Sequence, residues 1–196
     1  MGIADRPEAM ALAHRGLTGA TWRTLDSARR KHLLSCAVAA TEALHWACAL
    51  DEQLSKEVAG YDSRRDQDDE GRVLPGLRHV RDRAMHQVIV GTAQDTRNFY
   101  KPRRGLFHIA SSFPIWTPAA ALPRPARRHH HPERETAYEE YVAERGAWKP
   151  LFEALSFLTR ELDGKVPLLL IDEPSWFGEL TTEERVAISQ GPMLMQ

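Results

Sequence analysis

The stretch from Thr24 to Lys56 reads TLDSARRKHLLSCAVAATEALHWACALDEQLSK, and it decides the fold class. No Pro or Gly occurs between Ala20 and Gly60. Apolar residues recur there at spacings of three and four, which is the period of an amphipathic helix. They are Leu33, Ala37, Ala40, Leu44, Ala47, Leu54 and Val58. In a chain of 196 residues, such a helix must cover its apolar face with other helices or with a second chain.

The segments around this helix also favour helices. Their periodicity, together with Pro at the starts and Gly at the stops, predicts the bounds of each element. We expect a short helix from Pro7 to Gly16, a polar linker from Tyr61 to Arg72, a helix from Pro75 to about Asp95, and a helix from about Arg134 to Leu162. Gly146 and Pro150 should bend or break the last of these.

The region 97–132 has no clear periodicity and contains six Pro and five aromatic residues. We expect an extended, partly packed arm whose aromatic side chains lie against the helices. A short strand at 166–171 and a helical turn at 181–188 are expected near the end of the chain. The sequence thus predicts an all-α helical bundle of four to five helices with a Pro-rich basic arm and a short C-terminal extension. Its organisation is one structural domain, with the bundle and motif helix in 1–96, the arm in 97–133, and the completing helix plus extension in 134–196.

Charge and cysteine content limit the classes of function. The net charge is −1, so overall charge does not predict a nucleic-acid partner. The region 97–134 nevertheless carries eight Arg or Lys against one acid, which suits either a polyanion or a solvated loop. Cys36 and Cys48 are expected about 18 Å apart on one helix, too far for a disulfide. With no signal pattern and no membrane-length apolar run, we expect a cytoplasmic protein that does not bind a membrane.

The segment Leu74–Val88 carries the most specific chemical pattern. It contains Arg81, followed by Asp82 and, after four intervening residues, by His86. A guanidinium can hold a phosphate through paired donors, and an imidazole can move a proton near neutral pH. On a continuous helix Arg81 and His86 would point about 140° apart, whereas Asp82 and His86 would share a face. The same spacing also occurs from Arg124 to His129, but only the match at Arg81 lies in a predicted helix.

This arrangement resembles the HEPN superfamily, the higher eukaryote and prokaryote nucleotide-binding domains. The resemblance rests on Arg81-Asp82-Arg83-Ala84-Met85-His86 and on the flanking sequence LRHVRDRAMHQ, and it covers roughly Asp26 to Thr92. It implies a small helical bundle that pairs into a homodimer, with the motifs of two protomers at one cleft. One HEPN subgroup has a Tyr two residues after the His, which a partner enzyme modifies. Here that position is Val88, so this modification is not implied.

The resemblance also implies metal-independent cleavage of RNA, in which a 2′-hydroxyl attacks its own phosphate. His86 would be the general base or acid, Arg81 would stabilise the phosphate charge, and Asp82 would orient the imidazole. The residues expected to hold RNA are Arg78, Arg83, Gln87, Arg103 and Arg104. No cofactor or metal is implied, and an antitoxin or a phage-defence protein is the expected partner besides RNA.

Other patterns are weaker. His129-His130-His131 favours a flexible basic tract over a metal site, because consecutive residues of an extended chain point to opposite sides. The segment 168–174, LLLIDEP, looks like the strand that precedes the acids of an ATPase, but no Gly-rich phosphate loop with Lys occurs in the chain. The alternatives to an endoribonuclease are a non-catalytic helical module that binds a nucleotide, RNA or a partner protein, and an accessory structural protein.

Overall fold

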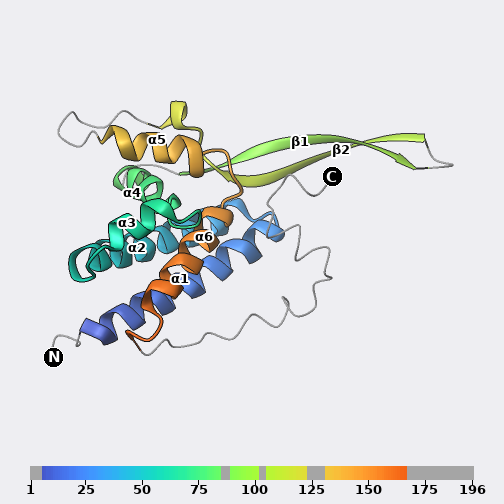
Figure 1. Ribbon diagram of the computed structural model, residues 1–196. Coiled ribbons are helices and arrows are strands. Elements are labelled where there is room, and N and C mark those ends of the chain that lie inside the picture. Colours follow the sequence, from blue (N-terminus) through green and yellow to red (C-terminus); the bar gives the residue numbers. More distant parts are fainter. Residues whose placement is uncertain (1–5, 85–88, 102–104, 123–130, 167–196) are drawn as a thin grey trace.

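The computed structural model describes residues 6–84, 89–101, 105–122 and 131–166. In this part of the chain there are six α-helices, one short 3-10 helix (Ala119–Ala121) and one antiparallel pair of strands. Figure 1 shows the helices gathered into one body, from which the two strands project as a long hairpin. The predicted all-α helical bundle is therefore confirmed, with six described helices in place of the four to five expected.

Helices α1 (Arg6–Arg29) and α2 (Leu33–Glu57) form an antiparallel pair. The prediction of a first helix that stops at Gly16 is wrong, since α1 continues for 13 more residues to Arg29. The prediction of one helix from Thr24 to Lys56 is also wrong, because the chain turns at Lys31, which has a left-handed φ of 59°. A left-handed residue commonly ends a helix, but Gly is the usual choice, so Lys gives no warning of this turn.

The segment predicted as a polar linker contains helix α3 (Tyr61–Gln67), and α4 (Val73–Ala84) follows it. Tyr61 and Arg65 of α3 are buried, so this segment packs, contrary to the prediction. Between the two helices, Asp68 accepts hydrogen bonds from the backbone N–H groups of Glu70 (2.8 Å) and Gly71 (3.0 Å). This carboxylate satisfies donors that precede α4, as capping residues do.

Helices α5 (Pro132–Tyr141) and α6 (Lys149–Leu162) replace the single helix expected over 134–162. The chain breaks near Gly146 and Pro150, as predicted. Helix α5 packs closely on α4 at Gly76, where a Cβ atom would lie 2.9 Å from the backbone of Ala137. Helix α6 packs against α1 and α2, and the orange and blue ribbons of α6 and α1 run beside one another in Figure 1.

Strands β1 (Val90–Lys101) and β2 (Gly105–Trp116) form the hairpin, with Val90 paired to Trp116 and Lys101 paired to Gly105. Two expectations are therefore wrong: the helix does not continue to Asp95, and the boundary between 96 and 97, where the arm is expected to begin, falls inside β1. The alternation of polar and apolar residues along 90–101 is weak. The sequence pattern therefore does not mark where the helix ends and β1 begins. The predicted strand at 166–171, apart from Val166, and the predicted turn at 181–188 lie outside the described residues.

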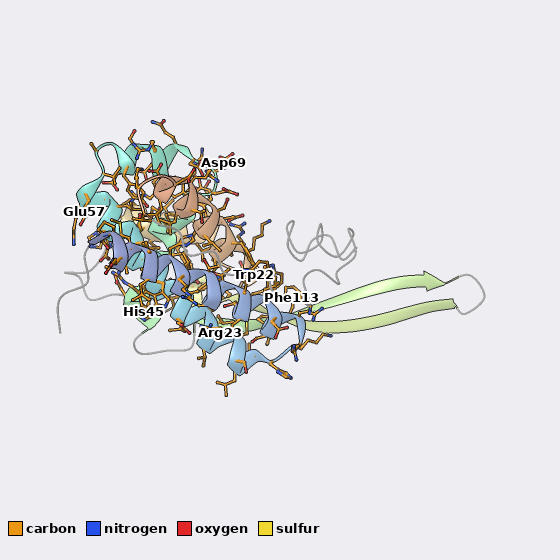
Figure 2. All side chains as sticks on the ribbon, turned by 90° about the horizontal axis from the view of Figure 1, so that it is seen from below. Trp22, Arg23, His45, Glu57, Asp69 and Phe113 are labelled. Carbon is orange, nitrogen blue, oxygen red and sulfur yellow. The ribbon has the colours of Figure 1, made fainter. Side chains whose placement is uncertain are left out.

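The root of the hairpin is tied to the turn between α5 and α6. The N–H of Trp116 donates to the carbonyl of Arg145 (3.0 Å), and the N–H of Ala147 donates to the carbonyl of Pro114 (3.0 Å). Trp116 is fully buried, and Figure 2 labels Phe113 where the hairpin leaves the bundle. The outer part of the ribbon is thus anchored at one end by backbone hydrogen bonds and core packing.

One apolar core joins the helices. The largest side chains with less than 2% exposure include Leu44 and Leu54 of α2, Leu77 of α4, Tyr138 of α5 and Leu158 of α6. Among the described residues, α2 alone is long and apolar enough to cross a membrane, and half of its most apolar window is buried in the bundle. This is weak evidence of a membrane span, because the core helix of a bundle has the same composition.

Candidate functional site

A buried carboxylate, Asp51, lies at the centre of the contact between α2, α3 and α4. Its side chain is 0% exposed. The hydroxyl of Tyr61 donates to Asp51 Oδ1 at 2.8 Å, and Arg65 Nη1 donates to the same oxygen at 3.2 Å. Arg78 of α4 forms an ion pair with Asp51 Oδ2 through Nε. One acid therefore holds side chains from two neighbouring helices, and we call these four residues the Asp51 cluster.

In the Asp51 cluster the buried charges are paired with opposite charges, because a buried charge without a partner is costly. Arg65 also contacts Asp62 and Asp66 at its outer side, each at 2.9 Å. Burial disfavours the charge on Arg65, but Asp51 and Asp66 raise its pKa overall. Burial and the neighbouring charge of Asp51 raise the pKa of Tyr61, so its hydroxyl stays protonated and remains a donor. At neutral pH the Asp51 cluster therefore holds α3 and α4 against α2.

Arg81 lies beside this cluster, one turn after Arg78 on α4. Its Nη1 donates to Glu52 Oε1 of α2 at 2.5 Å. Its Nε and Nη2 both donate to Oδ1 of Asp82, at 3.2 and 3.0 Å. Burial works against the charge on Arg81, whereas the neighbouring Cys48 and the hydrogen bonds to Glu52 and Asp82 raise its pKa. A guanidinium has five N–H donors, so these three contacts leave two donors for another acceptor.

The structure places only part of the predicted site. Arg78, Arg81 and Asp82 are on α4, where Arg81 has 23% of its side chain exposed and Asp82 has 39%. Arg83 belongs to the backbone of α4, and its side chain is not among those described. His86, Gln87, Arg103 and Arg104 lie outside the described residues, as do His129 and His130 of the predicted basic tract. The expected contact between Asp82 and His86 therefore stays a prediction.

A groove of about 430 Å³ opens between α3, α4 and α5, and we call it the α4–α5 groove. Four arginines line it, namely Arg65, Arg72, Arg78 and Arg134, together with Asp66 and Glu133. Pro75, Ala137 and Tyr141 supply less polar walls. Arg81 is not among its lining residues. In the described part of the chain, α4 therefore contributes arginine to two neighbouring sites, one at Arg81 and one in this groove.

The two cysteines are buried and free. Both lie on α2, as predicted, and burial raises the pKa of each to about 12. A thiol with so high a pKa is protonated at neutral pH and is a poor nucleophile. Within the described ranges, no group of three or more His, Cys, Asp and Glu side chains comes together as metal ligands would.

Sequence reasoning missed Asp51, Glu52, Tyr61 and Arg65. A signal for Asp51 was present, because position 51 continues the apolar spacing from Leu44 through Ala47 to Leu54. An acid on the apolar face of a helix predicts a buried carboxylate with a basic partner. The partners of Asp51 could not be identified in the same way. They come from α3 and α4, and the sequence does not specify how these helices pack on α2.

Comparison with known proteins adds no relative: no family model matches the chain, and no curated protein or solved structure is significantly similar to it. The HEPN resemblance therefore remains a prediction from the residues of its motif.

Proposed function

We propose that the chain is a metal-independent endoribonuclease of the HEPN type, which acts as a homodimer in the cytoplasm. In this proposal His86 transfers the proton, Arg81 stabilises the charge on the phosphate and Asp82 orients the imidazole of His86. The biological setting we propose is a toxin–antitoxin or phage-defence system, with an antitoxin or a defence protein as partner.

The position of Arg81 is the observation that supports this proposal. Glu52 holds the guanidinium from another helix at 2.5 Å, and Asp82 holds it from its own helix. A donor fixed in advance stabilises a transition state better than one that must be ordered during the reaction. Two N–H donors remain for a phosphate, and His86 follows Arg81 by five residues.

The test is cleavage of a labelled RNA in the presence of EDTA. We expect products that end in a 2′,3′-cyclic phosphate, because the attacking group is the 2′-hydroxyl of the RNA itself. The variants His86→Ala and Arg81→Ala should each lower the rate about 10²-fold or more, with unchanged circular dichroism. Arg23→Ala is the matched control, since Arg23 is an exposed arginine of α1 paired with Glu42. Cleavage that needs magnesium, or a fully active His86→Ala, would contradict the proposal.

The second candidate is a non-catalytic helical module that binds RNA, a nucleotide or a partner protein. One observation favours it: the charge of Arg81 is compensated by Glu52 and Asp82, which also suits a purely structural role. This candidate predicts binding without turnover and full tolerance of His86→Gln. Measuring RNA affinity and cleavage on the same preparation separates the two functions.

A further inference from the structure

The α4–α5 groove contains a buried donor without an acceptor. Arg78 lines the groove with 12% of its side chain exposed. Its Nη2 atom is buried and has no hydrogen-bond partner among the described residues. A buried polar group that lacks a partner is costly, and such groups commonly mark a place where water, an ion or a ligand binds. Arg78 therefore lines the groove and has hydrogen-bonding capacity that the described residues do not use.

The balance of buried charge supports the same view. Among the described residues, Asp51 is the one carboxylate that forms an ion pair with Arg78, and it is shared with Arg65. Arg65 has Asp62 and Asp66 as further partners, whereas no second acid contacts Arg78 in the described structure. An anion that bound beside Arg78 would complete its pairing, which is the arrangement a buried guanidinium requires.

A second arginine reaches the groove from another helix. Arg134 lies in the first turn of α5, and it lines the groove together with Arg78 of α4. The two helices are held in close contact at Gly76, where a Cβ atom would lie 2.9 Å from Ala137 O and from Tyr138 Cα. The packing of the helix backbones thus fixes the two arginines on one groove.

The chemistry of the groove favours a phosphate over a carboxylate. A planar carboxylate fits one guanidinium fork, whereas a tetrahedral phosphate presents three terminal oxygens to donors from different directions. Pro75 and Tyr141 provide a wall on which an organic group can lie. A volume of about 430 Å³ is within the range of small-molecule sites.

The rim distinguishes a small ligand from a nucleic acid. Asp66 and Glu133 line the groove with 58% and 67% of their side chains exposed. A polyanion lying along the groove would place some of its phosphates beside these carboxylates. A small molecule that places its phosphate at Arg78 and Arg134 brings only one charged group into the groove.

We propose that the α4–α5 groove binds a small phosphate monoester through Arg78 and Arg134, with its organic part against Pro75 and Tyr141. The proposal does not depend on RNA cleavage, because Arg81 does not line the groove. It assigns Arg78 to this ligand, whereas the sequence had suggested an RNA contact for it.

Calorimetric titration of the full chain tests the proposal, at constant ionic strength, with inorganic phosphate, phenyl phosphate and acetate as probes. We expect phosphate to bind at least tenfold more tightly than acetate, and phenyl phosphate to bind more tightly than inorganic phosphate. Arg134→Ala should weaken phosphate binding at least tenfold. Arg23→Ala, which removes an exposed arginine of α1, should bind phosphate as the wild type does.

Equal binding of phosphate and acetate would overturn the proposal, and so would an unchanged affinity in Arg134→Ala. A folded Arg134→Ala, checked by circular dichroism, keeps the test valid without the riskier change at Arg78. If a short single-stranded RNA binds through Arg134 while phosphate and phenyl phosphate do not, the groove belongs to RNA and the small-ligand proposal is wrong.

Discussion

Helix α2 contacts its neighbours in two different ways. Toward α1 it presents the ring of Trp46, which lies against Gly16 and leaves no room there for a Cβ atom. Toward α3 and α4 it presents the buried carboxylate Asp51. The first contact depends on volume, because closely packed interiors tolerate little added size. The second depends on the number and direction of hydrogen-bond donors, so the two should respond to different substitutions.

The largest effect is expected from Asp51→Ala. The change leaves Arg65 and Arg78 buried without their shared carboxylate, and breaking a buried ion pair on one side costs about 3–5 kcal/mol. Urea denaturation followed by circular dichroism measures the loss. Asp51→Asn keeps the shape but removes the charge, so it should recover only a small part of the stability. A loss below about 1 kcal/mol for Asp51→Ala would mean that the buried guanidiniums do not need this acid.

A smaller effect is expected from Gly16→Ala in the α1–α2 contact. The added Cβ would lie 2.6 Å from the ring of Trp46, so the ring must shift. Overpacking costs about 1–3 kcal/mol, and the removal of a helical glycine returns up to about 1 kcal/mol. Because the cost comes from Trp46, the same substitution in a Trp46→Leu background should cost less. Equal losses in the two backgrounds would assign the effect to another neighbour.

A pH-dependent effect is expected at His14, which joins α1 to α6 through a hydrogen bond of 2.8 Å between Nε2 and Thr159 Oγ1. Burial lowers the pKa of His14 below its ordinary value of 6.5. Above that value both the folded and unfolded chains hold neutral His14, and its contribution is complete. As the pH falls below 6.5, the unfolded chain binds a proton first, so stability declines toward the lower folded pKa.

Urea midpoints measured from neutral to mildly acidic pH check this expectation. His14→Gln should remove the part of the decline that begins near pH 6.5. The decline at more acidic pH should persist, because hydrogen bonds with Arg64 lower the pKa of Glu161 and its stabilising pair is lost only as that carboxylate is protonated. An unchanged pH profile in the variant would exclude His14 as its source.

The smallest effect is expected from Arg23→Ala. Arg23 and Glu42 form an ion pair of 2.7 Å on the surface of α1 and α2, with 56% and 45% of their side chains exposed. Such pairs contribute about 0–1 kcal/mol and weaken as salt is added. Thermal unfolding at low and high salt should therefore show a difference from the wild type that is small and disappears at high salt. A loss comparable to that of Asp51→Ala would remove the distinction between exposed and buried pairs.

The sequence predicted the parts of the fold that follow from periodicity. The helical character of 33–56 and the break near Gly146 are local features, and both are present, although the predicted start at Thr24 is wrong. The turn at Lys31 was missed because its left-handed φ occurs in a residue type that rarely adopts it. The hairpin was missed because its polar–apolar alternation is weak. Its strands are stabilised by pairing over 12 positions and by the contacts of Trp116 with the turn after α5, which is distant in sequence.

For the candidate site, the sequence identified Arg81 and Asp82 but not what surrounds them. A motif gives the residue types and their spacing along one element. The carboxylate of Glu52 comes from a different helix, 29 residues earlier in the chain, and only the packing of α2 on α4 brings it to Arg81. The Asp51 cluster has the same origin, since its members belong to three helices.

The anchoring of the hairpin has a mechanical consequence. Trp116 exchanges backbone hydrogen bonds with the turn that follows α5, donating to Arg145 O and accepting from the N–H of Glu144 at 3.1 Å. The Tyr138 hydroxyl of α5 also donates to the carbonyl of Thr117 at 2.5 Å. The β2 end of the ribbon is therefore attached to α5 and to the turn after it by these hydrogen bonds. A load applied to the strands is transmitted as torque to that helix, and through it to the side of the bundle on which Arg134 lies.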